Sequence, residues 1–79
     1  MGQYSKDPGL VSQYKMDTDA LSDDAKVGME TYLQWGEAGP AEACAESVGI
    51  LLGGGRKNAE QFKRSFPRTL VWVKSKVKL

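Results

Sequence analysis

The sequence predicts a small, mainly α-helical protein of the α+β class, with about three short helices and a strand-like C-terminal tail. Apolar residues recur at helical spacing through the middle of the chain, and capping residues and glycines delimit these segments. The C-terminal residues alternate instead. With 79 residues, the chain has room for one domain. We expect an N-terminal arm at 1–17 and a single small helical domain at 18–79 that ends in a basic tail.

The arm carries little regular pattern. Asp7, Pro8 and Gly9 together form a turn signal. From Leu10 to Met16 apolar and polar residues alternate loosely, as they do in a short strand. Because this alternation is weak, we predict an arm rather than a defined element.

The first helix is predicted over 22–35. Ser22 suits the N-cap position, and the two aspartates that follow it favour the positive end of the helix dipole. Apolar residues then recur at helical spacing, namely Leu21, Ala25, Met29, Tyr32 and Leu33. Trp35 extends this apolar face, and Gly36 ends the helix.

Two further helices are predicted over 40–52 and 58–66. Pro40 suits the first position of the second helix, and an apolar stripe and three glycines follow it. The stripe consists of Ala41, Cys44, Ala45, Val48, Leu51 and Leu52. In the third helix Asn58 can act as the N-cap, with Gln61 reaching back as in a capping box. The proline after this segment ends or kinks the helix, because it disfavours helical geometry at the residue before it.

The tail, residues 68–79, fits two secondary structures. As a strand, it alternates well, and its β-branched content favours this interpretation. As a helix, it continues one apolar face made of Phe66, Leu70, Val73 and Val77. The helical alternative gives an all-α protein with a fourth helix from Pro67. A strand needs a partner strand, which the N-terminal arm or another molecule would have to provide.

Composition argues against several kinds of site. The chain has no histidine and one cysteine, which removes the commonest general base and the commonest metal ligand. We therefore expect no enzymatic activity, no metal and no cofactor. Cys44 lies on the apolar stripe of the second helix, so we expect a core thiol rather than a nucleophile.

Cysteine usage and hydropathy also predict the location of the protein. A lone cysteine suits a reducing compartment, and no apolar run approaches the length of a membrane span. The N-terminus shows no hydrophobic signal segment. We expect a soluble, intracellular protein of the cytoplasm that has no membrane partner.

Charge is divided sharply along the chain. From Gly55 onward there are eight cations against one acid, a formal charge of +7, whereas the preceding residues carry three cations against nine acids, a charge of −6. Such asymmetry indicates a polyanionic or charge-matched partner. The candidate binding surface consists of Arg56, Lys57, Lys63, Arg64, Arg68, Trp72, Lys74, Lys76 and Lys78.

Two functional hypotheses follow from these features. The first is a non-catalytic protein–protein interaction or structural protein, a small subunit or accessory factor of a larger assembly or a binder of one protein target. Self-association is included, because the basic tail of one copy can meet the acidic front of another. The alternative is a nucleic-acid-binding protein that uses the basic C-terminal third, in which Phe62, Phe66 and Trp72 would stack on bases.

Overall fold

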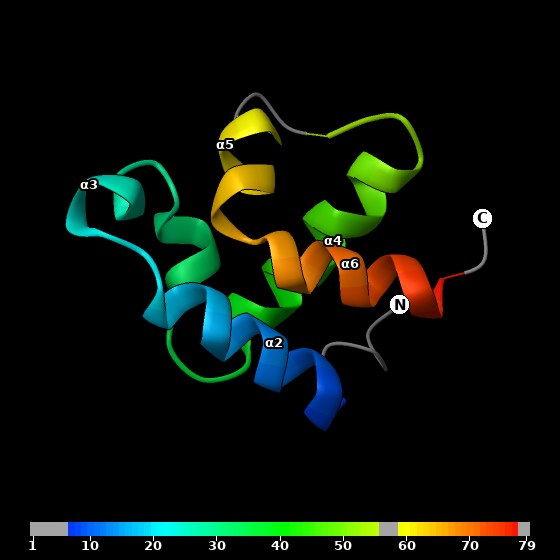
Figure 1. Ribbon diagram of the computed structural model, residues 1–79, viewed down its shortest axis with the longest axis horizontal. Coiled ribbons are helices and arrows are strands. Elements are labelled where there is room, and N and C mark those ends of the chain that lie inside the picture. Colours follow the sequence, from blue (N-terminus) through cyan, green and yellow to red (C-terminus); the bar gives the residue numbers. More distant parts are fainter. Residues whose placement is uncertain (1–6, 56–58, 78–79) are drawn as a thin grey trace.

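Helices account for most of the described chain, which covers residues 7–55 and 59–77 of a computed structural model (Figure 1). In chain order these helices are α2 (Pro8–Asp19), α3 (Asp23–Lys26), the 3-10 helix η1 (Glu30–Leu33), α4 (Ala38–Leu51), α5 (Ala59–Ser65) and α6 (Pro67–Lys76). No strand occurs within these ranges. The mainly α-helical prediction is therefore confirmed, whereas the number of helices and the strand-like tail differ from the prediction.

Helix α2 occupies the segment for which the sequence predicts an arm with a weak strand. The Asp7–Pro8–Gly9 turn signal is the start of this helix. The Asp7 side chain accepts a hydrogen bond from the Gly9 backbone N–H at 2.7 Å, and Pro8 stands at the first helical position. The strand interpretation is wrong, and α2 continues through Asp19 across the predicted boundary between arm and domain.

The single helix predicted over 22–35 is also wrong. Ser22 does cap a helix, accepting from the Ala25 backbone N–H at 3.1 Å, but α3 ends after four residues. Gly28 breaks the segment because it adopts a φ of 89°, which is accessible mainly to glycine. The Gly28 N–H donates to the Glu30 carboxylate, and η1 begins there. Trp35 lies beyond η1 and is 97% exposed, so it does not extend an apolar face.

Helix α4 lies close to its predicted bounds. It begins two residues before Pro40 and ends one residue before 52. Gly53 follows it with a φ of 90°, as expected for a glycine that terminates a helix. Cys44 is 3% exposed, so the predicted core thiol is confirmed.

Helix α5 falls inside the range predicted for the third helix. The predicted cap, Asn58, lies outside the described residues. Gln61 donates a side-chain hydrogen bond to the Val27 carbonyl at 2.7 Å, which ties α5 to the segment between α3 and η1.

The tail forms α6, so the preferred strand interpretation is wrong and the alternative of a helix from Pro67 describes this segment. Pro67 fits the first helical position because it has no N–H to satisfy. Val73 turns inward and is 1% exposed. Tertiary packing on α2 and α4 therefore outweighs the β-branched composition of the segment.

The core consists of two adjoining clusters. One contains Met29, Tyr32, Ala43, Phe62 and Phe66, and the other contains Leu10, Cys44 and Val73. The second cluster brings α2, α4 and α6 together, and Figure 1 shows α2 and α6 side by side. The rings of Phe62 and Phe66 lie 4.9 Å apart and are fully buried. These two aromatic residues are core residues and offer no exposed ring to a nucleobase.

Candidate interaction surface

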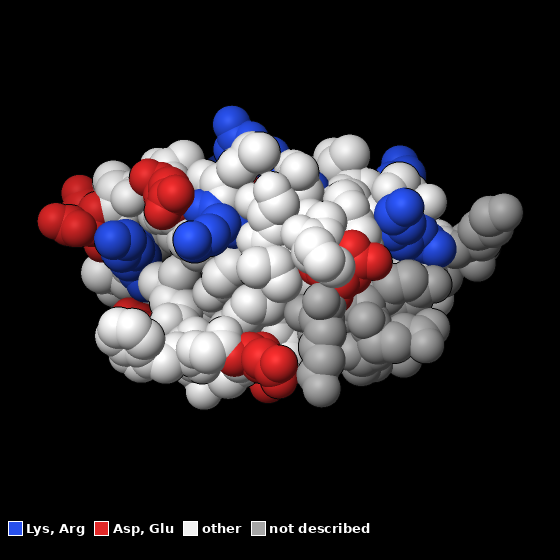
Figure 2. Space-filling view, turned by 90° about the horizontal axis from the view of Figure 1, so that it is seen from below, with Lys and Arg blue, Asp and Glu red and all other residues white. Residues whose placement is uncertain are grey.

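The predicted binding residues do not gather into one basic patch. Arg56, Lys57 and Lys78 lie outside the described residues. Lys63 pairs with Glu60 of the same helix at 3.2 Å. In Figure 2, lysine and arginine side chains form small separate groups on the face shown, with acidic side chains beside and between the groups. Acidic and basic residues, which are separated along the sequence, are thus largely intermixed on this face of the fold.

Arg64 lines a hollow of about 510 Å³ between the α2–α3 connection and α5. Asp24 of α3 lines the same hollow, together with the Gln61 side chain. This hollow therefore carries charges of both signs, and it does not extend the predicted basic surface.

Helix geometry separates the lysines of α6. In the predicted strand, Lys74, Lys76 and Trp72 share one face. In a helix, Lys74 and Lys76 point in directions about 160° apart, so the three residues do not share one face. Lys76 instead lies over the Trp72 ring, with Nζ 5.5 Å from the ring centroid, in a cation–π contact.

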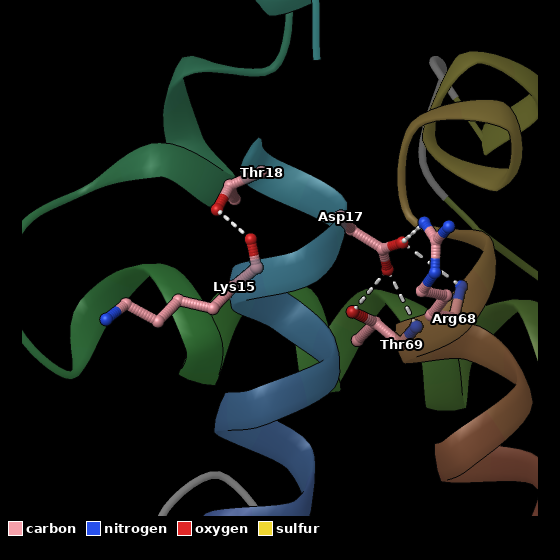
Figure 3. Close-up of polar contacts among 5 residues, drawn as sticks. All are labelled: Lys15, Asp17, Thr18, Arg68 and Thr69. Atoms are coloured by element: carbon pink, nitrogen blue, oxygen red, sulfur yellow. Dashed lines mark hydrogen bonds and ion pairs between the residues drawn. The ribbon is translucent and has the colours of Figure 1, made fainter. Parts of the chain in front are cut away.

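Arg68 is held at the start of α6 by a buried carboxylate of α2 (Figure 3). Asp17 is 1% exposed and accepts four hydrogen bonds. Two come from Arg68, through its backbone N–H at 3.3 Å and its guanidinium at 3.2 Å. The other two come from the backbone N–H and the hydroxyl of Thr69, each at 2.8 Å. The N-terminus of α6 is thus already capped by an internal anion.

A groove of about 440 Å³ runs between α2 and α6. It is lined by Gln13 of α2 and by Pro67, Arg68, Val71, Trp72 and Ser75 of α6. Val71 is 67% exposed and thus offers an apolar side chain within the groove. Half of the Arg68 side chain, 51%, is also exposed despite its bond to Asp17. The groove therefore presents an apolar side chain and an oriented guanidinium to solvent.

Trp72 forms one wall of this groove. A Cβ atom on Gly9 would lie only 2.7 Å from the indole Nε1, so the glycine allows α2 to approach the ring closely. Lys76 of α6 also contacts the ring. The indole is therefore contacted from both helices.

The electrostatics of the groove favour an anion. Arg68 lines it, Lys76 covers the adjoining Trp72 ring, and among the described lining residues there is no carboxylate. Asp17 is buried and accepts from both the α6 N-terminus and the Arg68 guanidinium, so it offsets part of the arginine charge, and the exposed half of the Arg68 side chain remains open to a further anion. An apolar segment that carries acidic residues matches this surface.

Comparisons with known proteins give no relative on which to base an assignment. The chain matches no family model. Searches of curated proteins and of solved structures likewise return no match. Within residues 7–55 and 59–77, no group of three or more cysteine, aspartate or glutamate side chains is placed to hold a metal ion. In the same ranges, no helix has the length and apolar character needed to cross a bilayer.

Sequence reasoning identified two residues of the groove, Arg68 and Trp72, and missed the others. Gln13 was assigned to an arm, and its place in the groove depends on α2 packing against α6. The strand predicted for the tail places Val71 within an alternating pattern. The helical alternative places Val71 away from the apolar face, where its side chain is exposed.

Proposed function

We propose that this protein is a non-catalytic interaction protein, a small subunit or accessory factor of a larger assembly. Its groove between α2 and α6 binds an acidic, apolar segment of another protein molecule. The observation that carries this proposal is the exposure of Val71, 67%, in a groove that holds an arginine and no carboxylate among its described lining residues.

The energetics of the groove support binding by a protein. Covering a valine that is mostly exposed contributes about 1–2 kcal/mol. Tryptophan and arginine, the two neighbours of Val71, are the residue types most enriched at interface hot spots. Arg68 is also pre-oriented by Asp17, so less side-chain entropy is lost when it meets a carboxylate.

The nucleic-acid alternative receives less support from the same residues. Two of its three stacking aromatics, Phe62 and Phe66, are fully buried. Lys63 is paired with Glu60 of its own helix. A protein segment that needs one apolar pocket and one or two cations fits better than a phosphate backbone, which needs a continuous track of cations.

A substitution that introduces a negative charge into the groove tests the proposal. Val71→Glu places a carboxylate where we expect an acidic partner, and its exposed position should leave the fold intact. Leu52→Glu is the matched control, because Leu52 is also 67% exposed but lies at the end of α4, outside the groove lining. Tagged wild type and both variants are used to capture partners in the native cell, and each captured protein is purified and titrated directly.

We expect at least one purified partner whose affinity falls about tenfold or more with Val71→Glu and is unchanged with Leu52→Glu. Its binding segment should carry acidic residues, and neutralising them should have the same effect as Val71→Glu. If every partner binds the Val71→Glu variant as well as wild type, the proposal is wrong. Recovery of RNA or DNA alone, with binding that weakens steeply in salt, would also overturn it.

A further inference from the structure

Trp35 is the most exposed large apolar side chain of the described residues, at 97%. It stands in the turn at residues 35–37, between η1 and α4, where Gly36 adopts a φ of 66°. A tryptophan usually buries about 150–250 Å² in a core or interface. Exposing an indole to this extent forgoes that stabilisation, which indicates that another surface covers it.

The turn is held in place from both sides. Before it, the Gln34 side chain donates to the Thr31 carbonyl at 2.8 Å. After it, Gly39 lies so close to the chain that an added Cβ would come within 2.7 Å of the Gln34 carbonyl oxygen. These contacts hold the backbone on either side of the turn, so less backbone entropy is lost when Trp35 meets a partner.

The turn also carries negative charge, which is absent from the described residues that line the groove. From Val27 to Gly55 the chain contains four acids and no cation. Glu37 belongs to the turn itself, and Glu30 starts the adjacent 3-10 helix. An exposed aromatic ring with nearby carboxylates is the kind of segment that the α2–α6 groove suits, since the groove combines apolar side chains with Arg68.

The turn does not line the groove of its own molecule. The groove is lined by residues of α2 and α6, and none of residues 35–37 is among them. In the view of Figure 1, the green loop that joins η1 to α4 passes below α2, whereas α6 lies above α2. Contact between the turn and the groove, as both stand in this structure, therefore requires a second molecule.

We propose that the groove binds the Trp35 turn of a second copy of this chain. This inference rests on the proposed function of the groove and names its partner. Trp35 would pack against Val71 and beside Trp72, with the Glu37 carboxylate on the side of Arg68. Because each copy offers one turn and one groove on different faces, the contact is heterologous, so it propagates into rings or open filaments.

Mixing two variants tests this arrangement. Trp35→Ala removes the turn's anchor and keeps the groove, whereas Val71→Glu blocks the groove and keeps the turn. Their matched controls are Val27→Ala, at 68% exposure, and Leu52→Glu, at 67%. Sedimentation velocity over a range of concentrations measures the assembly state of each protein alone and of equimolar mixtures.

We expect wild type and both controls to form species larger than a dimer as concentration rises. Trp35→Ala and Val71→Glu should each weaken association about 30-fold or more, as loss of a hot-spot residue does. Their mixture should form a species no larger than a 1:1 dimer, because only one competent turn and one competent groove remain. Wild type that stays monomeric at about 1 mM, or a mixture that does not form this dimer, would overturn the inference.

The two proposals can fail separately. A monomeric wild type whose binding to a different purified protein still depends on Val71 removes the second copy as partner and leaves the function of the groove in place. Self-association that Val71→Glu and Trp35→Ala leave unchanged would show that copies meet elsewhere. That result overturns the inference without bearing on binding of another protein.

Discussion

Asp17 and Thr69 are 52 positions apart in the sequence, yet the Asp17 carboxylate accepts both the backbone N–H and the hydroxyl of Thr69 at 2.8 Å. In most helices such a cap comes from the residue just before the first turn. In α6 that residue is Phe66, whose side chain makes no capping hydrogen bond. Helix α2 therefore supplies the cap, and the same bonds hold together the two helices that form the groove.

Replacing Asp17 should destabilise the protein. Asp17→Ala leaves the first N–H groups of α6 without acceptors, so we expect the free energy of unfolding to fall by about 2–3 kcal/mol. Asp17→Asn keeps one acceptor oxygen and should lose less, about 1–2 kcal/mol. Asp19→Asn is the control, because Asp19 is exposed in the same helix and should change stability by less than about 0.5 kcal/mol. Urea unfolding followed by circular dichroism measures all three, and equal losses at both positions would contradict the capping role.

The sequence predicted elements whose signals are local. Helix α4 has its proline, its apolar stripe and its terminal glycine within one segment, and its predicted bounds were close. The tail carried signals for both strand and helix, and what decided between them was a carboxylate of α2 together with the burial of Val73. The residues of the tail alone cannot indicate that Asp17, 52 positions before Thr69, caps the helix.

The missed helix α2 has a different cause. Its described buried residues are Leu10 and Asp17 alone, so its sequence lacks an apolar stripe of the usual width. The predicted surface omits the α2 side of the groove for the same reason, because Gln13 lies on that helix. The charge pattern of the sequence directs attention to the basic third that contains α6, but the ion pairs of Arg68 and Lys63 become evident only in the fold.

Two glycines of α4 should respond in opposite directions to alanine. At Gly39 a Cβ would lie 2.7 Å from the Gln34 carbonyl oxygen and 2.9 Å from that of Tyr32, so Gly39→Ala should cost about 1–3 kcal/mol. At Gly49 the nearest atom would be 3.9 Å away, so Gly49→Ala should stabilise the protein by about 0.5–1 kcal/mol through helix propensity. Thermal unfolding distinguishes the two, and a loss of stability at Gly49 would contradict the packing described for α4.

The Tyr14 hydroxyl should make stability depend on pH at the alkaline end. It donates to the Tyr32 carbonyl, and burial raises the pKa of Tyr14 above its ordinary value of 10.0. Above pH 10 the unfolded chain loses this proton before the folded protein does, so the free energy of unfolding falls as pH rises toward the folded pKa. This contribution is fully present below pH 10.

Tyr14→Phe should remove that dependence. The variant loses one hydrogen bond, which costs about 1 kcal/mol at pH 8. Between pH 9 and pH 11 its stability should fall less steeply than that of wild type, because the titrating group is absent. Urea unfolding at several pH values measures both slopes, and parallel slopes would contradict the shifted pKa of Tyr14.

The rate at which the Cys44 thiol reacts should report on separation of α2, α4 and α6. It packs with Leu10 of α2 and Val73 of α6, and burial raises the pKa of its thiol, so the native protein holds little reactive thiolate. We expect a disulfide reagent at pH 8 to label the folded protein at least about 1000-fold more slowly than the unfolded chain, given ordinary domain stability. The label is unambiguous because the chain has one cysteine.

Asp17→Ala should accelerate labelling about 30-fold or more, in proportion to its loss of stability, whereas Asp19→Asn should not. Rapid labelling of the folded wild type would show that α2, α4 and α6 separate without global unfolding.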